Sequence, residues 1–357
     1  MGGCCEVLPM TNFKASDFRP NSPAALIAAL PAVLGFVPEH SLVLVTFEDD
    51  ELGCVMRVDL SGELDESLAH LVDVAATNGP DAVVAVIVDE DGAGCRMCLD
   101  DHRVLADVLA EHLESRCVEL LAAYVVDRLE EGGQWHRVDG EPGAGAVDDP
   151  MSSPMAAAAV LEGRRLYARR AELQAVVAVD PVRAEGLRAA MLLAEHDGEL
   201  RPDVDARRDV EHALAVARGL SEGMVPEDDD LAAVGCAIAD TRVRDTLYAL
   251  AVGREADRAE TLWALLARTL PDPWRVEALV LLAFSAYARG DGPLAGVSLE
   301  AALRSDGGHR MAVMLDQALQ SGMRPDQIRE LAQTGYRLAK RLGVRLPPRQ
   351  GVGKRAG

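Results

Sequence analysis

Aromatic residues and lysine are scarce in this chain of 357 residues. Phenylalanine, tryptophan and tyrosine together make up 4% of the sequence, whereas hydrophobic residues make up 49% and charged residues 26%. The hydrophobic and charged fractions are those of a globular protein, and an alanine-rich, aromatic-poor composition favours closely packed helices. Lysine supplies only Lys14, Lys340 and Lys354 of the 36 basic residues, a bias that indicates genome composition rather than a chemistry.

A secretory signal is also missing. The first nine residues, MGGCCEVLP, contain neither a positively charged region nor an apolar one, and Glu6 stands where a myristoylation motif requires serine or threonine. The seven cysteines are an odd number spread along a long chain, which favours reduced thiols in a cytoplasm. Met10 is an alternative start, so we expect residues 1–9 to be disordered or absent from the natural protein.

Charge of one sign dominates the first part of the chain. Residues 1–150 contain 29 acidic and 8 basic residues, a balance of −21, whereas residues 151–357 contain 29 acidic and 28 basic residues. The acidic half repels phosphate backbones, which disfavours nucleic acid as a partner. Residues 301–357 contain four acidic and eleven basic residues. The terminal stretch, residues 337–357, has no aromatic residues to stack on bases, so we interpret it as a solvated basic tail.

One apolar stretch near the N-terminus, SPAALIAALPAVLGFVPEHSLVLVTF, is not a membrane span. A span requires about 20 apolar residues in one regular element. Here Ser22 and Pro23 form a helix start, and Gly35 is suited to end that helix. The run SLVLVTF that follows predicts a buried strand. Pro31 lies inside the helix, where its missing N–H predicts a kink or a split.

Strand and helix patterns alternate after this stretch. We predict further strands at residues 53–60, 81–90, 117–127 and 134–138, and helices at residues 63–78 and 99–116. Apolar strands that alternate with helices indicate an α/β domain with a mixed sheet and flanking helices, which we assign to residues 10–138. Residues 139–154 are rich in glycine, proline and aspartate and predict a connector to a second domain.

The second domain, residues 155–342, shows mostly helical periodicity. Apolar positions recur in it at a spacing of 34 residues: Leu247, Leu250 and Leu265 return as Leu281, Phe284 and Leu299. That period predicts two tetratricopeptide-like hairpins within residues 242–307, the alternative being an ordinary helical bundle with a coincidental period. We expect residues 343–357 to form a basic, disordered tail.

Four stretches resemble a known family in their order along the chain. They are LIAALPAVLGFVPEHSLVLV, RVDL at residues 57–60, SSPMAAAAVLEGRRLYARRAEL at residues 152–173, and LLAFSAYARGDGPLAGVSLEAAL at residues 281–303. The family that they resemble is an actinobacterial one, the domain of unknown function 4192. That family has no established activity, so the resemblance implies no catalytic residues for this chain.

Two cysteines and a histidine form the clearest candidate for a metal site. Cys95 and Cys98 have the Cys-x-x-Cys spacing that lets two thiolates reach one ion. A helix that continues from Cys98 would bring His102 around by about one turn. A fourth ligand would have to come from elsewhere in the chain. A zinc site, a redox pair and two thiols without a role are therefore three open interpretations.

Acidic residues mark a second candidate site. Asp89, Glu90 and Asp91 follow directly after an apolar strand, where α/β proteins commonly place their sites, and carboxylates are suitable ligands for a divalent cation. Arg57 and Asp59 share one face of another strand, either as an ion pair on the solvent side or as part of a pocket. We take these five residues together as a ligand-binding candidate, with a solvated turn as the alternative for the acidic run.

The sequence thus favours a cytoplasmic, non-membrane binding or scaffolding protein, whose helical domain docks a protein partner. The alternative is a metal-dependent hydrolase or transferase with its site at the strand ends of the α/β domain. No catalytic residue and no cofactor is predicted, apart from a divalent metal or zinc at the two candidate sites.

Overall fold

The protein divides into two compact units. The computed structural model describes residues 6–8, 22–48, 51–61, 64–77, 79–161, 163–194 and 201–349. Unit 1 comprises residues 1–173 and 317–323, and unit 2 comprises residues 174–316 and 324–357. The segment 139–154, which we expect from the sequence to connect two domains, lies inside unit 1.

Unit 1 contains a sheet of seven strands in the order β1-β3-β2-β4-β5-β6-β7. The strands are β1 (Glu6–Leu8), β2 (Ser41–Glu48), β3 (Glu51–Asp59), β4 (Ala82–Val88), β5 (Glu119–Val126), β6 (Gln134–Arg137) and β7 (Ala144–Ala146). Strands β4 and β5 are parallel, and every other neighbouring pair is antiparallel. The predicted α/β domain with a mixed sheet is therefore confirmed.

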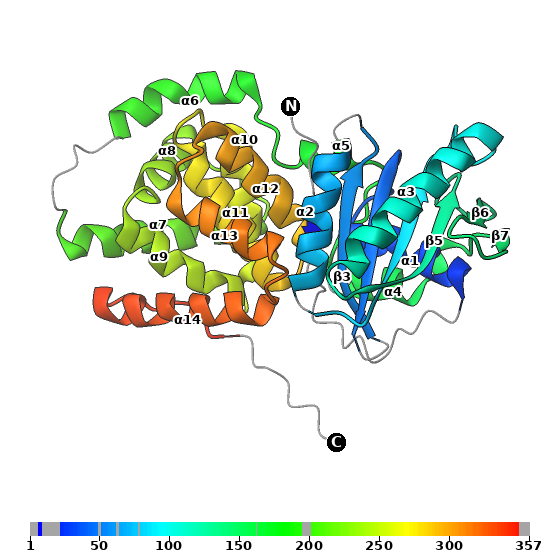
Figure 1. Cartoon of the computed structure of the whole chain (residues 1–357). Helices are drawn as coiled ribbons and strands as arrows, with labels where there is room; N and C mark the ends of the chain where they lie inside the picture. The colour runs from blue at the N-terminus through cyan, green and yellow to red at the C-terminus, as the bar shows by residue number, and fades with distance from the viewer. Residues whose placement is uncertain are drawn as a thin grey trace. The chain divides into compact units, whose positions relative to one another are not determined.

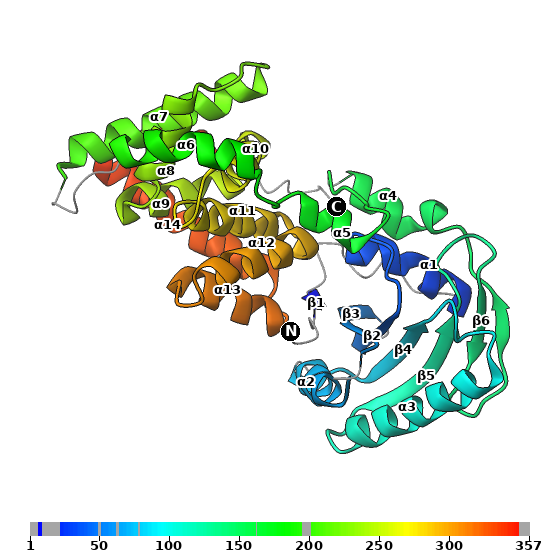
Figure 2. The ribbon, with the colours of Figure 1, turned by 90° about the horizontal axis from the view of Figure 1, so that it is seen from above.

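Helices cover both faces of this sheet. They are α1 (Pro23–Leu34), α2 (Leu64–Thr77), α3 (Arg96–Glu114) and α4 (Pro154–Leu161), with the short 3-10 helix η2 (Pro150–Ser152) before α4. Helices α2 and α3 lie on one face, and α1 and α4 lie on the other, as the view from above shows (Figure 2). Leu42, Leu44, Met56 and Ile87 belong to the core on the α2 and α3 side.

The capping residues of α1 act as the sequence predicts. The Ala25 N–H donates a hydrogen bond of 3.2 Å to the Ser22 hydroxyl, and Gly35 closes the helix with a φ of 76°. Gly35 thus adopts the left-handed conformation that glycine reaches without strain. Helix α1 runs as one element through Pro31, so the expectation that this proline could split the helix is wrong.

The structure describes part of the two segments for which the sequence predicts disorder. Of residues 1–9, the structure describes Glu6–Leu8, which form β1 and pair with β3. Of the expected tail, it describes residues up to Arg349, and Arg349 forms an antiparallel bridge with Gly253. The rest of both segments lies outside the described residues.

Unit 2 is helical throughout its described residues (Figure 1). After α5 (Arg170–Ala175), which spans the division between the units, the elements are α6 (Pro181–Ala194), α7 (Asp203–Ser221), α8 (Asp228–Ala237), α9 (Thr241–Leu247), η3 (Tyr248–Val252), α10 (Ala256–Thr269), α11 (Arg275–Arg289), α12 (Gly292–Ser305), α13 (Arg310–Gln320) and α14 (Pro325–Leu342). Helix α13 also spans the division, because residues 317–320 belong to unit 1. The predicted helical character of the second half is confirmed.

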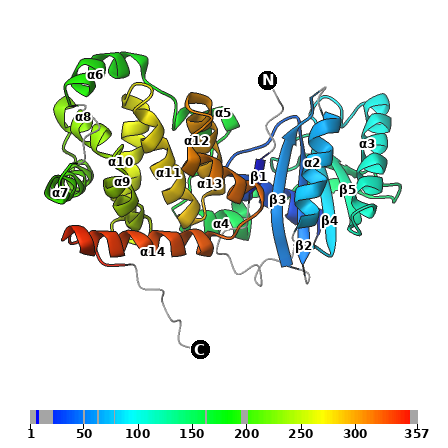
Figure 3. The same cartoon turned by 60° about the vertical axis from the view of Figure 1, so that its left-hand side comes forward.

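The centre of unit 2 is α11, which packs between α10 and α12 (Figure 3). Phe284 and Tyr287 of α11 and Trp263 of α10 are at most 1% exposed, so three of the few aromatic side chains of the chain lie in this core. A left-handed glycine, Gly290, ends α11 and allows the sharp turn into α12. Within the described part of the chain, no helix is both long enough and apolar enough to cross a bilayer.

Candidate functional site

The predicted ligand-binding residues lie at one edge of the sheet in unit 1. The carboxyl ends of the parallel strands β4 and β5 meet there, because Val88 pairs with Val126. The antiparallel strand β2 begins at the same edge, where Ser41 pairs with both Val88 and Asp59. Sites of α/β proteins commonly lie at such a carboxyl edge.

The structure separates these residues onto the two faces of the sheet. Arg57 pairs with Val43 and points to the face that α1 covers, since its neighbours in sequence, Met56 and Val58, belong to the core under α2 and α3. Asp89 instead contacts His102 of α3. Glu90 and Asp91 are exposed in the turn that follows β4. The five predicted residues therefore share an edge without forming one cluster.

Arg57 forms an ion pair with Asp59, but not on the solvent side. The arginine is only 3% exposed. Its Nε donates a hydrogen bond of 2.9 Å to the Ser41 hydroxyl, its Nη2 contacts the Asp59 carboxylate, and its guanidinium carbon lies 5.9 Å from the centre of the Phe36 ring. Its Nη1 is buried without a hydrogen-bond partner. The arginine joins β2, β3 and the end of α1, so its contacts are those of a structural residue.

Asp89 holds two histidines at the edge of the other face. Its Oδ2 lies 3.1 Å from His102 Nε2, and its Oδ1 lies 3.5 Å from His40 Nδ1. Asp89 and His102 are buried, whereas the His40 side chain is 66% exposed. The His102 Nδ1 is buried without a hydrogen-bond partner. A buried carboxylate in contact with an imidazole can hold the ring in one orientation and can accept a proton.

The two cysteines lie at the start of α3. Cys95 occupies the N-cap position, its carbonyl accepting the first helical hydrogen bond from the Leu99 N–H at 2.9 Å, and Cys98 lies in the first turn. Both thiols are free and half-buried. His102 comes one turn later, as predicted, but its Nε2 contacts Asp89 instead of facing the sulfurs. Among the described residues, no three histidine, cysteine, aspartate or glutamate side chains are grouped as metal ligands would be.

The surroundings of the two thiols shift their pKa values in opposite directions. The backbone N–H of Cys98, the Cys98 thiol and the backbone N–H of Met97 face the Cys95 sulfur and lower the pKa of Cys95. These N–H groups do not make a full capping hydrogen bond to that side chain, so they act as dipoles at the helix start. The hydrogen bond to Cys95, burial and the negative charges of Cys95 and Asp89 raise the pKa of Cys98.

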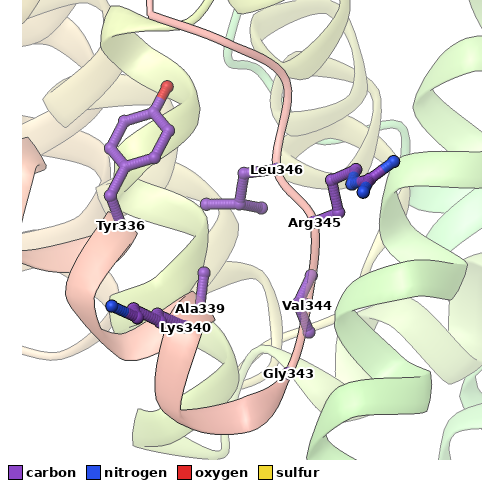
Figure 4. A pocket seen from close by; sticks show the side chains of 7 residues that line it. All are labelled: Tyr336, Ala339, Lys340, Gly343, Val344, Arg345 and Leu346. Carbon is purple, nitrogen blue, oxygen red and sulfur yellow. The ribbon is translucent and has the colours of Figure 1, made fainter.

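Unit 2 contains a pocket at the C-terminal end of α14. Its volume is about 360 Å3. It is lined by Tyr336, Ala339, Lys340, Gly343, Val344, Arg345 and Leu346. Gly343 ends α14 with a φ of 73°, and the chain then turns back along the helix, where the Tyr336 hydroxyl donates a hydrogen bond of 3.1 Å to the Pro347 carbonyl. The turn creates the pocket between the helix and the returning segment (Figure 4).

The pocket combines an apolar floor with a basic rim. Leu346 points between the helix and the returning segment, and Lys340 and Arg345 extend from opposite sides of it (Figure 4). Both cations are exposed. Arg207 of α7 also lies close by, since a side chain at Gly343 would approach its Nη1 to 3.3 Å, but its Nε is paired with Glu211 at 2.8 Å. This arrangement suits a ligand with an apolar group and negative charge.

No sequence motif marks these pocket residues as a site. Lys340 and Arg345 contribute to the basic C-terminal charge, which is the one sequence signal that points to this region. The other lining residues are ordinary helix and loop types. Their grouping depends on the turn at Gly343 and on the approach of α7, which a local pattern does not encode.

Comparisons with known proteins identify a family. A sequence profile of the family described as Domain of unknown function (DUF4192) matches residues 23–326, which is most of the chain. No curated protein and no solved structure matches the chain.

Proposed function

This chain belongs to the family described as Domain of unknown function (DUF4192), a description that assigns no activity, and we propose from the geometry that it is a cytoplasmic binding protein. Unit 2 docks an acidic segment of a protein partner in the pocket at the end of α14. The single observation that carries this proposal is the pocket itself, in which an apolar floor lies between the exposed cations Lys340 and Arg345.

The size and chemistry of the pocket support a side-chain anchor. Its volume of about 360 Å3 is at the lower end of the range of ligand pockets. Val344 is buried and Leu346 is half-buried, so an apolar side chain of the partner would lose water on entering. Carboxylates on either side of that anchor would meet Lys340 and Arg345. Charge pairs at such a rim set orientation and association rate more than affinity.

The tetratricopeptide-like hairpins remain part of this proposal. Helices α11 and α12 pack along each other around the Gly290 turn, which supports one of the two proposed hairpins. Repeats of this kind present concave surfaces to partners. In this protein α11 packs against α14, and we assign the contact with the partner to the pocket.

A cross-linking experiment tests the proposal. A photoreactive amino acid in place of Leu346 is introduced into the full-length protein, which is then incubated with extract of the native cytoplasm and irradiated. We expect a cross-link to an acidic segment of one partner, and we expect the double variant Lys340→Glu, Arg345→Glu to lose it. Arg337→Glu is the matched control, because Arg337 is exposed on the same helix and does not line the pocket.

Two results would contradict this function. One is an equal yield of the cross-link in the double variant and in the control. The other is a cross-link that maps to neutral or basic segments. A rise in salt concentration should weaken capture by the wild-type protein, because exposed charges are screened within about 8 to 10 Å at physiological ionic strength.

The metal-dependent hydrolase or transferase stays a second hypothesis. It is favoured by Asp89 and His102, a buried carboxylate and imidazole 3.1 Å apart at the carboxyl edge of the sheet. Elemental analysis of the purified full-length protein, compared with Asp89→Asn, distinguishes it from the binding protein, since stoichiometric metal that depends on Asp89 would support the enzyme.

A further inference from the structure

Cys95 and Cys98 have no part in the proposed partner binding. They lie where the crossover β4-α3-β5 begins its helix, directly after the carboxyl end of a parallel strand. Residues three positions apart face the same side of a helix, so the two thiols are neighbours at the start of α3. A Cys-x-x-Cys pair at the start of a helix in such a crossover is typical of thiol–disulfide exchange.

The two thiols are suited to different steps of that chemistry. Cys95 is the first residue of the motif and sits over the free N–H groups at the start of α3, which stabilise a thiolate. Cys98 lies in the first turn of α3, and its thiol donates toward the Cys95 sulfur. The Cys95 thiolate is thus the attacking group, and the Cys98 thiol beside it stays protonated.

The surroundings provide a negative charge and a contact surface. The Asp89 carboxylate is close enough to act electrostatically on Cys98, and it is held in place by His102. Gly92 makes room for both, because a side chain there would overlap the Asp89 carboxylate. Between the two cysteines, the Met97 side chain is 74% exposed and presents an apolar surface next to the sulfurs.

We propose that Cys95 and Cys98 form a dithiol site that reduces disulfide bonds of basic polypeptides. The Cys95 thiolate attacks one sulfur of the substrate disulfide, the substrate S–S bond breaks, and the departing thiolate takes a proton from solvent. Cys98 then gives its proton to solvent and attacks the Cys95 sulfur of the mixed disulfide. The second substrate thiolate leaves and takes up a proton. Two electrons and two protons pass to the substrate, and the protein keeps a Cys95–Cys98 disulfide.

The negative charge of residues 1–150 and the exposure of Met97 favour basic polypeptides as substrates. Residues 1–150 carry a balance of −21, so an anionic disulfide such as oxidised glutathione is repelled from this region. A polypeptide disulfide flanked by basic residues is attracted, and it can cover Met97 with an apolar side chain. A dithiol reductant, supplied in the cell by another protein and in an assay by dithiothreitol, returns the pair to its reduced form.

Three substrates test this site. The full-length protein is added in catalytic amounts, and dithiothreitol serves as the reductant. Two of the substrates are disulfide-linked fluorescent peptides that differ only in having arginine or glutamate beside the cysteine, and the third is oxidised glutathione. We expect the protein to accelerate reduction of the arginine peptide most. Cys95→Ser should lose the acceleration, and Cys98→Ser, mixed with the peptide without dithiothreitol, should accumulate the mixed disulfide with the peptide. Cys117→Ser, at an exposed cysteine beyond the other end of α3, should behave as the wild type.

The proposal is overturned if Cys95→Ser reduces the arginine peptide as fast as the wild type, or if the wild type shows no acceleration. Faster reduction of the glutamate peptide or of glutathione overturns the substrate class. Mass spectrometry of the alkylated protein provides an independent readout. After limited oxidation, residues 95 and 98 should resist alkylation together and lose two hydrogen masses, and oxidation that joins either of them to a different cysteine would contradict the pair.

Discussion

Gly92 shows how a single missing side chain permits the contact between Asp89 and His102. A Cβ at this position would overlap the Asp89 carboxylate and would lie 3.0 Å from the His102 ring. Gly92 is buried, and its neighbours are the Asp89 carboxylate and the ring of His102 in α3, which are hydrogen-bonded to each other. Neither of them is free to move without losing that hydrogen bond, so the glycine is required for space.

We therefore predict that Gly92→Ala destabilises the protein by about 1 to 3 kcal/mol, the usual cost of overpacking. Gly94→Ala is the control, because a Cβ at Gly94 meets no atom within 4 Å. Guanidinium unfolding of both variants measures the difference. An equal unfolding free energy for the two variants would show that the loop relaxes around the added methyl group and would contradict the account of Gly92.

The residue types predict at which edge of the sheet the candidate residues lie, but not on which face of the sheet. Acidic residues directly after an apolar strand indicate a carboxyl edge, and Asp89 does lie there. The face on which a side chain lies depends on which strand pairs with which. Arg57 and Asp89 are placed on opposite faces by pairings between strands that are distant in sequence. A local pattern contains no information about those pairings, so the predicted five-residue group could not be resolved from sequence.

Elements whose ends carry clear capping residues could be predicted closely. Helix α1 has a serine cap, a proline at its first position and a left-handed glycine at its end, and its bounds match the prediction. Helix α3 begins at Arg96, three residues before the predicted start, because Cys95 caps it and cysteine is not a usual capping residue. Strand β7, with the sequence AGA, has no β-branched residue and was not predicted.

Two glycines inside helices provide a test at the scale of elements. Gly335 of α14 faces η3 and α9, and a Cβ there would approach the Thr246 carbonyl and the Ala249 Cβ to 2.8 Å. Gly186 of α6 is exposed, and a Cβ there would meet nothing within 4 Å. The first glycine allows two backbones to come close, whereas the second only adds flexibility to the unfolded chain.

The same substitution should therefore have opposite effects at these two positions. We predict that Gly335→Ala lowers the unfolding free energy by about 1 to 3 kcal/mol, because backbone atoms must move apart. Gly186→Ala should raise it by about 0.5 to 1 kcal/mol, the difference in helix propensity between the two residues. Thermal and guanidinium unfolding of each variant measure both values. A loss of stability at Gly186 or a gain at Gly335 would contradict the packing described for these helices.

At the scale of the whole molecule, charge distinguishes the two units. Residues 1–150, which lie in unit 1, carry a balance of −21, whereas residues 151–357 carry 29 acidic and 28 basic residues. A large charge of one sign destabilises a compact state through self-repulsion. Unit 1 should therefore depend on ionic strength much more than unit 2.

The three tryptophans allow each unit to be observed separately. Trp135 lies in unit 1, and Trp263 and Trp274 lie in unit 2. Fluorescence of the Trp263→Phe, Trp274→Phe double variant reports on unit 1, and fluorescence of Trp135→Phe reports on unit 2. Each variant is compared with itself at low and high sodium chloride, so the effect of the substitution on stability cancels.

We expect the melting temperature of unit 1 to rise by a few degrees when salt increases from about 0.05 M to about 0.5 M, because the Debye length shortens to a few ångströms. That shift corresponds to about 1 kcal/mol. The melting temperature of unit 2 should change much less, since its opposite charges are nearly balanced and many are paired, as Arg244 is with Glu277. Equal shifts in the two variants would mean that both units unfold as one cooperative block, and a fall for unit 1 would mean that its acidic residues are stabilised by pairing instead of destabilised by repulsion.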